Sequence, residues 1–262
     1  MDFLPAYGYA LAAMLVVGAV FWVVSLIRHD VSIVDSIWSL FFLLGAGIYA
    51  AAADDLGLRG GLVLVLVSLW ALRLSIYITA RNWGEGEDHR YQKIRENNQP
   101  NFAFKSLYIV FGLQATLAWI ISIPLLFAIA GGGSPGWLDG FALLLWIVGF
   151  VFEAGGDYQL ARFKADPDNQ GKVLDSGLWR YTRHPNYFGD ACIWWSYYLF
   201  ALAAGGWWTF YAPILMTLLL LKVSGVALLE KTISSRRPGY KDYVERTNAF
   251  IPGPPGSGGS SA

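Results

Sequence analysis

The sequence predicts an all-α integral membrane protein with seven transmembrane helices, its N-terminus outside and its C-terminus in the cytoplasm. Apolar residues make up 55% of the 262 residues and charged residues only 15%, whereas a soluble domain carries about 25% charged residues. Seven apolar stretches are long enough to cross the hydrocarbon core of a bilayer, which takes about 20 residues of helix. Basic residues concentrate in alternate connections between these stretches, as is typical of connections that face the cytoplasm.

The seven stretches are predicted to be helices because they are too long and too uniformly apolar for the alternating strands of a membrane barrel. The first lacks the basic leader and the cleavage site of a signal peptide, so we expect it to be a span. We expect residues 1–252 to form one domain and the tail 253–262, rich in Gly, Pro and Ser, to be disordered. The stretches cover residues 6–27, 31–53, 58–80, 107–130, 137–160, 187–204 and 206–229.

The distribution of basic residues predicts the orientation. One lies in the connection 28–30 and five lie in each of the segments 81–106, 161–186 and 230–262, which makes 16 of the 19. The connections on the opposite side hold only Arg59. We therefore expect the polar chemistry at the cytoplasmic face, where soluble cofactors are available, and we expect a bacterial inner membrane as the location.

Charge and cysteine content argue against several other classes. With 19 basic and 19 acidic residues, the chain has no net charge to attract nucleic acid. The single cysteine, Cys192, leaves no internal disulfide or cysteine metal cluster, and we expect it to serve in packing. The three histidines His29, His89 and His184 show no metal-ligand spacing, so we expect no metal.

Polar residues inside the apolar stretches are costly in hydrocarbon, so each one needs a reason. Either they form interhelical ion pairs, or they line a polar cavity open to the cytoplasm; their clustering toward the cytoplasmic half favours the cavity. On the third stretch and on the fifth, the polar residues share a helical face. The residues are Asp35 on the second stretch, Trp70, Arg73, Tyr77 and Arg81 on the third, Glu153, Asp157 and Lys164 on the fifth, and Lys222 and Glu230 on the seventh.

The segment Gly177–Asp190 carries the most specific signal. Pro185 suits the first turn of a helix, since its missing N–H needs no partner there. Free N–H groups at that helix start would favour a phosphate, with Arg183 and His184 just before it. Asn186 and Asp190 would continue along one face into the membrane. The alternative is a basic loop that contacts lipid head groups.

A second polar segment covers residues 229–243. Arg236 and Arg237 could contact phosphate, because the guanidinium fork matches phosphate geometry. Tyr240 and Tyr243 could supply a stacking surface for adenine. The alternative is an amphipathic helix attracted to anionic lipid.

These motifs resemble those of a known family. Arg183-His-Pro-Asn-Tyr-Phe-Gly-Asp190 is similar to the signature shared by steroid 5α-reductases, sterol reductases and isoprenylcysteine methyltransferases. Gly156-Asp-Tyr-Gln-Leu-Ala-Arg-Phe-Lys164, Ser176-Gly-Leu-Trp-Arg-Tyr181 and Asp242-Tyr…Ala249-Phe-Ile-Pro252 resemble segments of the steroid 5α-reductases in particular. The resemblance covers residues 146–252 and indicates a bacterial-type steroid 5α-reductase.

The resemblance implies a seven-helix enzyme that binds NADPH near the cytoplasmic side and acts on a lipid-soluble steroid or enone from the membrane. It implies a donor on the second or third helix that holds the substrate ketone, for which the nearest positions are Asp35-Ser36 and Trp70. Lys164 and Asp190 depart from the Arg and Glu of relatives. With the residues singled out above, the expected cofactor contacts are Asp157, Lys164, Tyr181, Arg183, His184, Asn186, Tyr187, Asp190, Glu230, Arg236, Arg237, Tyr240 and Tyr243.

The expected reaction is reduction of a carbon–carbon double bond conjugated to a ketone, as in a 3-oxo-Δ4-steroid. Hydride from NADPH would attack the β carbon, and a donor would stabilise charge on the ketone oxygen. A carboxyl kept neutral by burial can be such a donor. Asp35 is the first candidate, supported by Tyr77 or Trp70.

Two alternatives stay open. The first is a membrane methyltransferase of the isoprenylcysteine type that uses S-adenosylmethionine; the many basic residues around 162–183 and 236–246 disfavour it, because that cofactor carries no phosphates. The second is a transporter or a lipid-binding membrane protein, which would favour broken helices in paired repeats. The sequence shows no such repeats.

Overall fold

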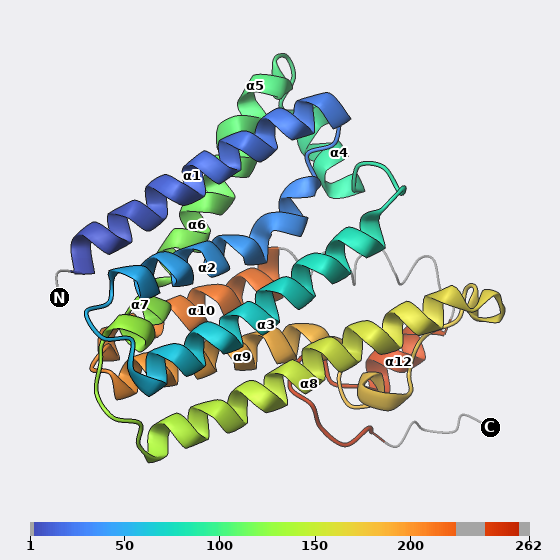
Figure 1. Ribbon diagram of the computed structural model, residues 1–262. Coiled ribbons are helices and arrows are strands. Elements are labelled where there is room, and N and C mark those ends of the chain that lie inside the picture. The colour runs from blue at the N-terminus through green and yellow to red at the C-terminus, as the bar shows by residue number, and fades with distance from the viewer. Residues whose placement is uncertain (1–2, 224–238, 257–262) are drawn as a thin grey trace. The chain divides into compact units, whose positions relative to one another are not determined.

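The computed structural model describes residues 3–223 and 239–256 (Figure 1). Throughout these ranges the regular structure is helical and no strand occurs. The predicted all-α class is therefore confirmed.

Five helical segments are long and apolar enough to cross a membrane. Many of their apolar side chains are exposed, among them Val16, Ile76 and Val151, as expected where helices face lipid. The protein is thus a multi-pass membrane protein. The segments are α1 (Phe3–Arg28), α2 (Ile33–Ala52), α3 (Gly57–Asn82), a composite helix over Phe102–Ile121 and α8 (Trp137–Ala165).

The fourth predicted span, 107–130, begins earlier and is interrupted. The helix starts at α5 (Phe102–Ser106), continues through the π-helical turn η1 (Leu107–Gly112) and ends with α6 (Leu113–Ile121). It breaks at Ser122, and α7 (Ile123–Ala130) follows with a proline in its first turn. Pro124 has no N–H to donate and its ring crowds the preceding turn, so an uninterrupted helix is disfavoured there.

The last two predicted spans are helical where the structure describes them. α9 (Pro185–Ala203) matches the predicted span 187–204 and begins at the predicted proline. The next stretch is made of η4 (Trp207–Phe210), α10 (Tyr211–Leu218) and the π-helical η5 (Leu219–Val223). Residues 224–229 of the predicted seventh span lie outside the described residues, so the count of seven stays a prediction.

Contacts divide the chain into two compact units, and the single domain 1–252 stays a prediction. The first unit holds residues 1–139 and 198–212. In it α1, α2 and α3 run in alternating directions (Figure 1), and α2 packs against both neighbours. Two serines join α2 to α3: the buried Ser39 hydroxyl donates to the Ala71 carbonyl oxygen at 2.8 Å, and the half-buried Ser75 hydroxyl donates to the Ser36 carbonyl oxygen at 2.7 Å.

The second unit holds residues 140–197 and 213–262, and its described part is built on the close packing of α8 against α9. Glycines make that approach possible, since a Cβ on Gly189 would collide with the backbone of Gly149 and Glu153. Further along the interface, the Trp146 indole donates to the Tyr197 hydroxyl at 3.2 Å. The short helix α12 (Tyr240–Arg246) follows near the C-terminal end.

Candidate functional site

The predicted site residues fall into the two units. Asp35, Trp70 and Tyr77, predicted to be catalytic, lie in the first unit, whereas the described cofactor candidates lie in the second.

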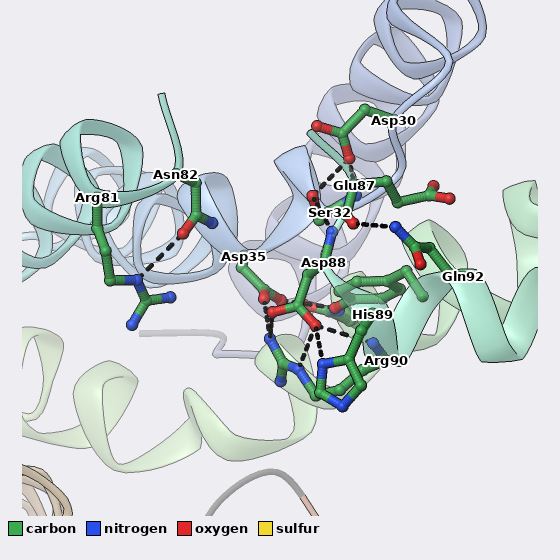
Figure 2. Close-up of polar contacts among 12 residues, drawn as sticks. Asp30, Ser32, Asp35, Arg81, Asn82, Glu87, Asp88, His89, Arg90 and Gln92 are labelled. Atoms are coloured by element: carbon green, nitrogen blue, oxygen red, sulfur yellow. Dashed lines mark hydrogen bonds and ion pairs between the residues drawn. The ribbon is translucent and has the colours of Figure 1, made fainter. Parts of the chain in front are cut away.

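Asp35 lies at the centre of a polar cluster that joins α2 to α4 (His89–Asn97), as Figure 2 shows. The Arg90 guanidinium donates to Asp35 Oδ2 at 2.7 Å, and the Tyr91 hydroxyl donates to Asp35 Oδ1 at 2.6 Å. The Gln114 amide in turn donates to the Tyr91 hydroxyl at 3.0 Å. Both carboxyl oxygens of Asp35 therefore receive hydrogen bonds.

The helix start at α4 supplies one of these partners. Asp88 is the N-cap: its carboxylate accepts from the Arg90 backbone N–H at 2.9 Å and from the Arg90 guanidinium. Arg90 thus lies between two carboxylates. Burial by itself would lower the pKa of Arg90, but the hydrogen bond that Arg90 donates to Asp88 and the negative charges of Asp35 and Asp88 outweigh burial and raise the pKa above its ordinary value. Arg90 is therefore always charged.

This cluster bears on the neutral-acid role expected for Asp35. A neutral Asp35 would give up its ion pair with Arg90, so the expected neutral-acid role would cost this interaction. Burial and the nearby Asp35 carboxylate raise the pKa of Tyr91 well above its ordinary value. Tyr91 is therefore a protonated donor at physiological pH, directed at Asp35.

Arg90, Tyr91 and Gln114 were not predicted as site residues. The mixed-charge segment 85–95 was visible in the sequence. Its partner Asp35 lies 55 residues before Arg90, and no local pattern connects them.

Trp70 and Tyr77 lie in different surroundings. Trp70 is fully buried, and its ring packs against Phe42 with the centroids 5.8 Å apart. Tyr77 is half-buried, and the Arg81 guanidinium lies 5.8 Å from the centre of its ring. Tyr77 is the more accessible of the two.

A cavity of about 230 Å³ lies in the first unit where α1 and α3 end and α2 begins. Ser36, and not Asp35, is the α2 residue of the predicted Asp35–Ser36 pair that lines it. Arg28, Asp30 and Asn82 contribute charged and amide groups to it, beside the hydroxyl groups of serine and threonine side chains. The sequence did not single out these three residues.

In the second unit the structure brings together two of the motifs. The Asn186 side-chain amide, in the first turn of α9, donates to Asp157 Oδ1 on α8 at 3.0 Å. Gly156 permits the approach, since a Cβ there would lie only 3.0 Å from the Pro185 ring and 3.2 Å from the Asn186 nitrogen. Asp157 is buried and Asn186 is half-buried. A polar pair from two distant motifs thus forms at the start of α9.

The connection before α9 is held against α8. Gly177 adopts a φ of +60°, which a glycine tolerates, and opens the 3-10 turn η3 (Gly177–Arg180). The Leu178 N–H then donates to the Gln159 side chain at 3.0 Å, and the Trp179 indole donates to the Gly156 carbonyl at 3.1 Å. These bonds fix the approach of the chain to Pro185.

Arg183 holds the C-terminal segment. Its guanidinium donates to the carbonyl oxygens of Val244 at 3.0 Å and Thr247 at 2.8 Å. Its backbone N–H donates to the carbonyl oxygen of Asn248 at 2.9 Å. The side chain is almost completely buried. To contact a phosphate, Arg183 would have to give up these hydrogen bonds. The structure therefore favours a role in which Arg183 positions the C-terminal segment.

The other cofactor candidates differ in exposure. His184 is buried and stacks on Tyr187 with the ring centroids 5.6 Å apart. Asp190, Tyr240 and Tyr243 are buried, and the Tyr243 hydroxyl donates to the Trp179 carbonyl. Lys164 and Tyr181 are exposed. The remaining three, Glu230, Arg236 and Arg237, lie outside the described residues.

Within the described ranges, no group of three or more His, Cys, Asp or Glu residues is arranged to hold a metal ion.

Comparisons with known proteins place the chain in a family. It is 27% identical over 269 aligned residues to an uncharacterised protein of Schizosaccharomyces pombe, an alignment that covers 90% of this chain and 77% of the relative. No solved structure matches it significantly. A family model matches residues 21–247, which is most of the chain and includes both polar clusters. The chain therefore belongs to the family described as "Protein of unknown function (DUF1295)".

Proposed function

We propose that the protein is a membrane reductase that uses NADPH to reduce the conjugated double bond of a 3-oxo-Δ4-steroid or a similar lipid enone. The observation that carries the proposal is the hydrogen bond between Asn186 and Asp157. It joins two of the four segments that carry the resemblance to steroid 5α-reductases, residues 156–164 and 183–190. An amide and a carboxylate held together at a helix start are suited to bind a polar ring or ribose.

The described residues of the second unit fit a phosphorylated dinucleotide. Four exposed basic residues lie in the last turns of α8 and in the connection to α9, which is held against α8 at Gly156 and Gln159. Exposed basic side chains near a helix start favour phosphate groups. The four are Arg162, Lys164, Lys172 and Arg180.

NADPH would supply the hydride for the β carbon of the enone. The residues of the chain would bind and orient the cofactor and protect it from water. Asn186 and Asp157 would orient the bound cofactor through their amide and carboxylate. Arg183 would keep the C-terminal segment in place through the Val244 and Thr247 carbonyls.

Among the predicted catalytic residues, Tyr77 is best suited to donate a hydrogen bond to the ketone oxygen. Its ring is half-buried and lies next to the Arg81 guanidinium, whose charge would favour negative charge developing nearby. Trp70 is fully buried against Phe42. Asp35 would act as a positioning residue that holds Arg90 and Tyr91.

We further propose seven spans, with α9 as the sixth and the helix beginning at Trp207 as part of the seventh. The N-terminus would lie outside, because the connections rich in basic residues would then face the cytoplasm. In a bacterium this would place the protein in the inner membrane with the basic end of α8 toward the cytosol. Cysteine labelling at exposed positions of the connections would test the orientation.

Ligand-dependent stability tests the cofactor. The purified full chain in detergent is heated with NADPH, NADH or S-adenosylmethionine; a ligand at 100 times its Kd stabilises the native state by about 2.7 kcal/mol. We expect NADPH to raise the Tm, Asn186→Ala to abolish most of the rise and the exposed control Gln170→Ala to retain it. Stabilisation by S-adenosylmethionine instead of NADPH would favour the methyltransferase.

Turnover tests the substrate class. A panel of enones is mixed with the protein and NADPH, and the loss of NADPH absorbance is followed. We expect Tyr77→Phe to lower kcat strongly while the Tm rise with NADPH is unchanged. Unchanged turnover in Tyr77→Phe would remove Tyr77 from the reaction.

A further inference from the structure

The cavity between the ends of α1, α2 and α3 has the composition of a binding site for an amphiphile. Its volume is about 230 Å³, which suits a head group and the first carbons of a chain. Phe21, Ile37 and Leu40 supply an apolar wall, and Arg28 and Asp30 supply two opposite charges. All of these residues belong to the first unit.

The cation at the cavity is oriented by an aromatic ring. The Arg28 guanidinium lies 5.7 Å from the centre of the Trp83 ring, and within the described ranges no carboxylate pairs with it. Stacking on a ring leaves the edge of a guanidinium open for hydrogen bonds. Arg28 can therefore donate to an anionic group that enters the cavity.

The acidic side chain at the cavity, Asp30, is also held in place. Asp30 Oδ1 accepts hydrogen bonds from the backbone N–H of Ser32 at 2.8 Å and from the Ser32 hydroxyl (Figure 2). Its other oxygen receives no hydrogen bond from the part of the chain that the structure describes. A nearby cation, Arg95, is itself paired with Glu87 at 2.7 Å. Asp30 can therefore accept from a cationic group of a ligand.

The depth of the cavity fits a lipid head group. It lies at the ends of three helices that are long enough to span a bilayer, which is where the head groups of the lipids lie. Trp83, which also lines it, is 71% exposed; exposed tryptophans are typical of the membrane interface.

We propose that this cavity binds a phospholipid with a primary ammonium in its head group. Arg28 binds the phosphate, Asp30 binds the ammonium, and the first acyl carbons lie along Phe21 and Leu40. A glycerol head group offers no cation to Asp30. A quaternary ammonium offers no N–H to donate. The proposal is independent of the reductase function, since Arg28, Asp30, Phe21 and Leu40 have no role in the proposed reduction.

The experiment measures lipid preference of the full chain. The protein is delipidated in detergent and titrated with phosphatidylethanolamine, phosphatidylcholine or phosphatidylglycerol, with bound lipid counted by native mass spectrometry and the Tm measured in parallel. We expect one tightly bound phosphatidylethanolamine, preferred over each of the others by about tenfold, as for one charge-assisted hydrogen bond. Equal affinity for the three lipids would overturn the proposal.

Two variants separate the two charges. Asp30→Asn should make phosphatidylethanolamine and phosphatidylcholine bind equally, because only the ammonium contact is weakened. Arg28→Ala should lower the affinity for both lipids. The matched control Lys93→Ala, an exposed basic residue of α4, should keep the wild-type preference. A preference that survives both Arg28→Ala and Asp30→Asn would place the lipid elsewhere and refute the site.

Soluble phosphoethanolamine distinguishes a lipid from a free head group. We expect millimolar phosphoethanolamine to leave the Tm unchanged, because it has no chain to bury against Phe21 and Leu40. Stabilisation by the soluble compound equal to that by the lipid would contradict a lipid site.

Discussion

Arg59 and Asp139 lie 80 residues apart and form a two-pronged ion pair, with Arg59 Nε 2.6 Å from Asp139 Oδ1 and Nη2 3.1 Å from Oδ2. Only 5% and 6% of their side chains are exposed. The guanidinium also donates to the carbonyl oxygens of Gly132 and Ser134, and the Gly136 N–H donates to Asp139. The pair therefore joins the start of α3 to the first turn of α8, and the bonds to Gly132 and Ser134 hold the connection between α7 and α8 against it.

Replacing Arg59 should destabilise the first unit strongly. Arg59→Met leaves the Asp139 carboxylate buried without its cation, and breaking a buried pair costs about 3–5 kcal/mol. The free energy of unfolding can be measured by denaturant titration in mixed micelles. The exposed control Lys93→Met should change it by less than about 0.5 kcal/mol. Adding Asp139→Leu to Arg59→Met should cost less than the sum of the two single losses; simple additivity would contradict a coupled pair.

The glycine contact between α8 and α9 gives a second prediction. Gly189→Ala forces a Cβ into the backbone of Gly149 and Glu153, and such overpacking costs about 1–3 kcal/mol or more. Gly140→Ala is the matched control on α8, because a Cβ there meets nothing within 4 Å. The control should be neutral or stabilising by up to about 1 kcal/mol, since alanine favours helix. Equal Tm values for the two variants would refute the close packing.

The cluster around Asp35 predicts how α4 is held. Asp35→Asn removes the ion pair with Arg90 and weakens the acceptor of Tyr91, interactions of a kind that contribute about 1.5–3 kcal/mol each. Limited trypsin digestion within α4 should therefore accelerate roughly tenfold or more, since about 1.4 kcal/mol corresponds to a factor of ten. Glu96→Gln, an exposed change on the same helix, should leave the rate unchanged. Equal rates for Asp35→Asn and the control would show that the cluster does not anchor α4.

Acidification should release the same segment. Burial alone would raise the pKa of Glu87, but hydrogen bonds from Arg95 and the Val31 N–H, with the charge of Arg95, lower it below its ordinary value of 4.5. For Asp88, burial is likewise outweighed by Arg90, and its pKa is lowered below the ordinary 3.8. Because the pKa of each carboxyl group is lower in the folded protein, the stabilisation that its charged form gives is complete above the ordinary pKa. This stabilisation is lost as the pH falls through the lowered pKa.

Hydrogen exchange of the α4 amides checks this dependence. After correction for the intrinsic pH effect, protection should be constant from pH 7 to about 5 and should fall below the ordinary value of 4.5 for Glu87. Glu87→Gln should lower the protection at pH 7 and flatten the decline. A decline of the same size in Glu87→Gln would assign it to other groups.

The local features of the sequence predicted local structure well. Long apolar stretches became helices, and Pro185 begins α9 as its missing N–H suggested. The fourth span differs from the predicted 107–130 because Pro124 interrupts the apolar run and the helix already starts at Phe102. The catalytic and cofactor roles remain predictions; the structure shows only that Asp157 and Asn186 meet and that Arg183 binds backbone carbonyls.

The sequence by itself determined that this is a helical membrane protein, because a run of about 20 apolar residues can satisfy its backbone in lipid only as a helix. Only the tertiary structure decided which polar groups satisfy one another. Asp35 meets Tyr91 across 56 residues and Arg59 meets Asp139 across 80, and neither pair leaves a local pattern. The physical reason is that a buried charge needs a partner, but which partner it finds depends on how the helices pack.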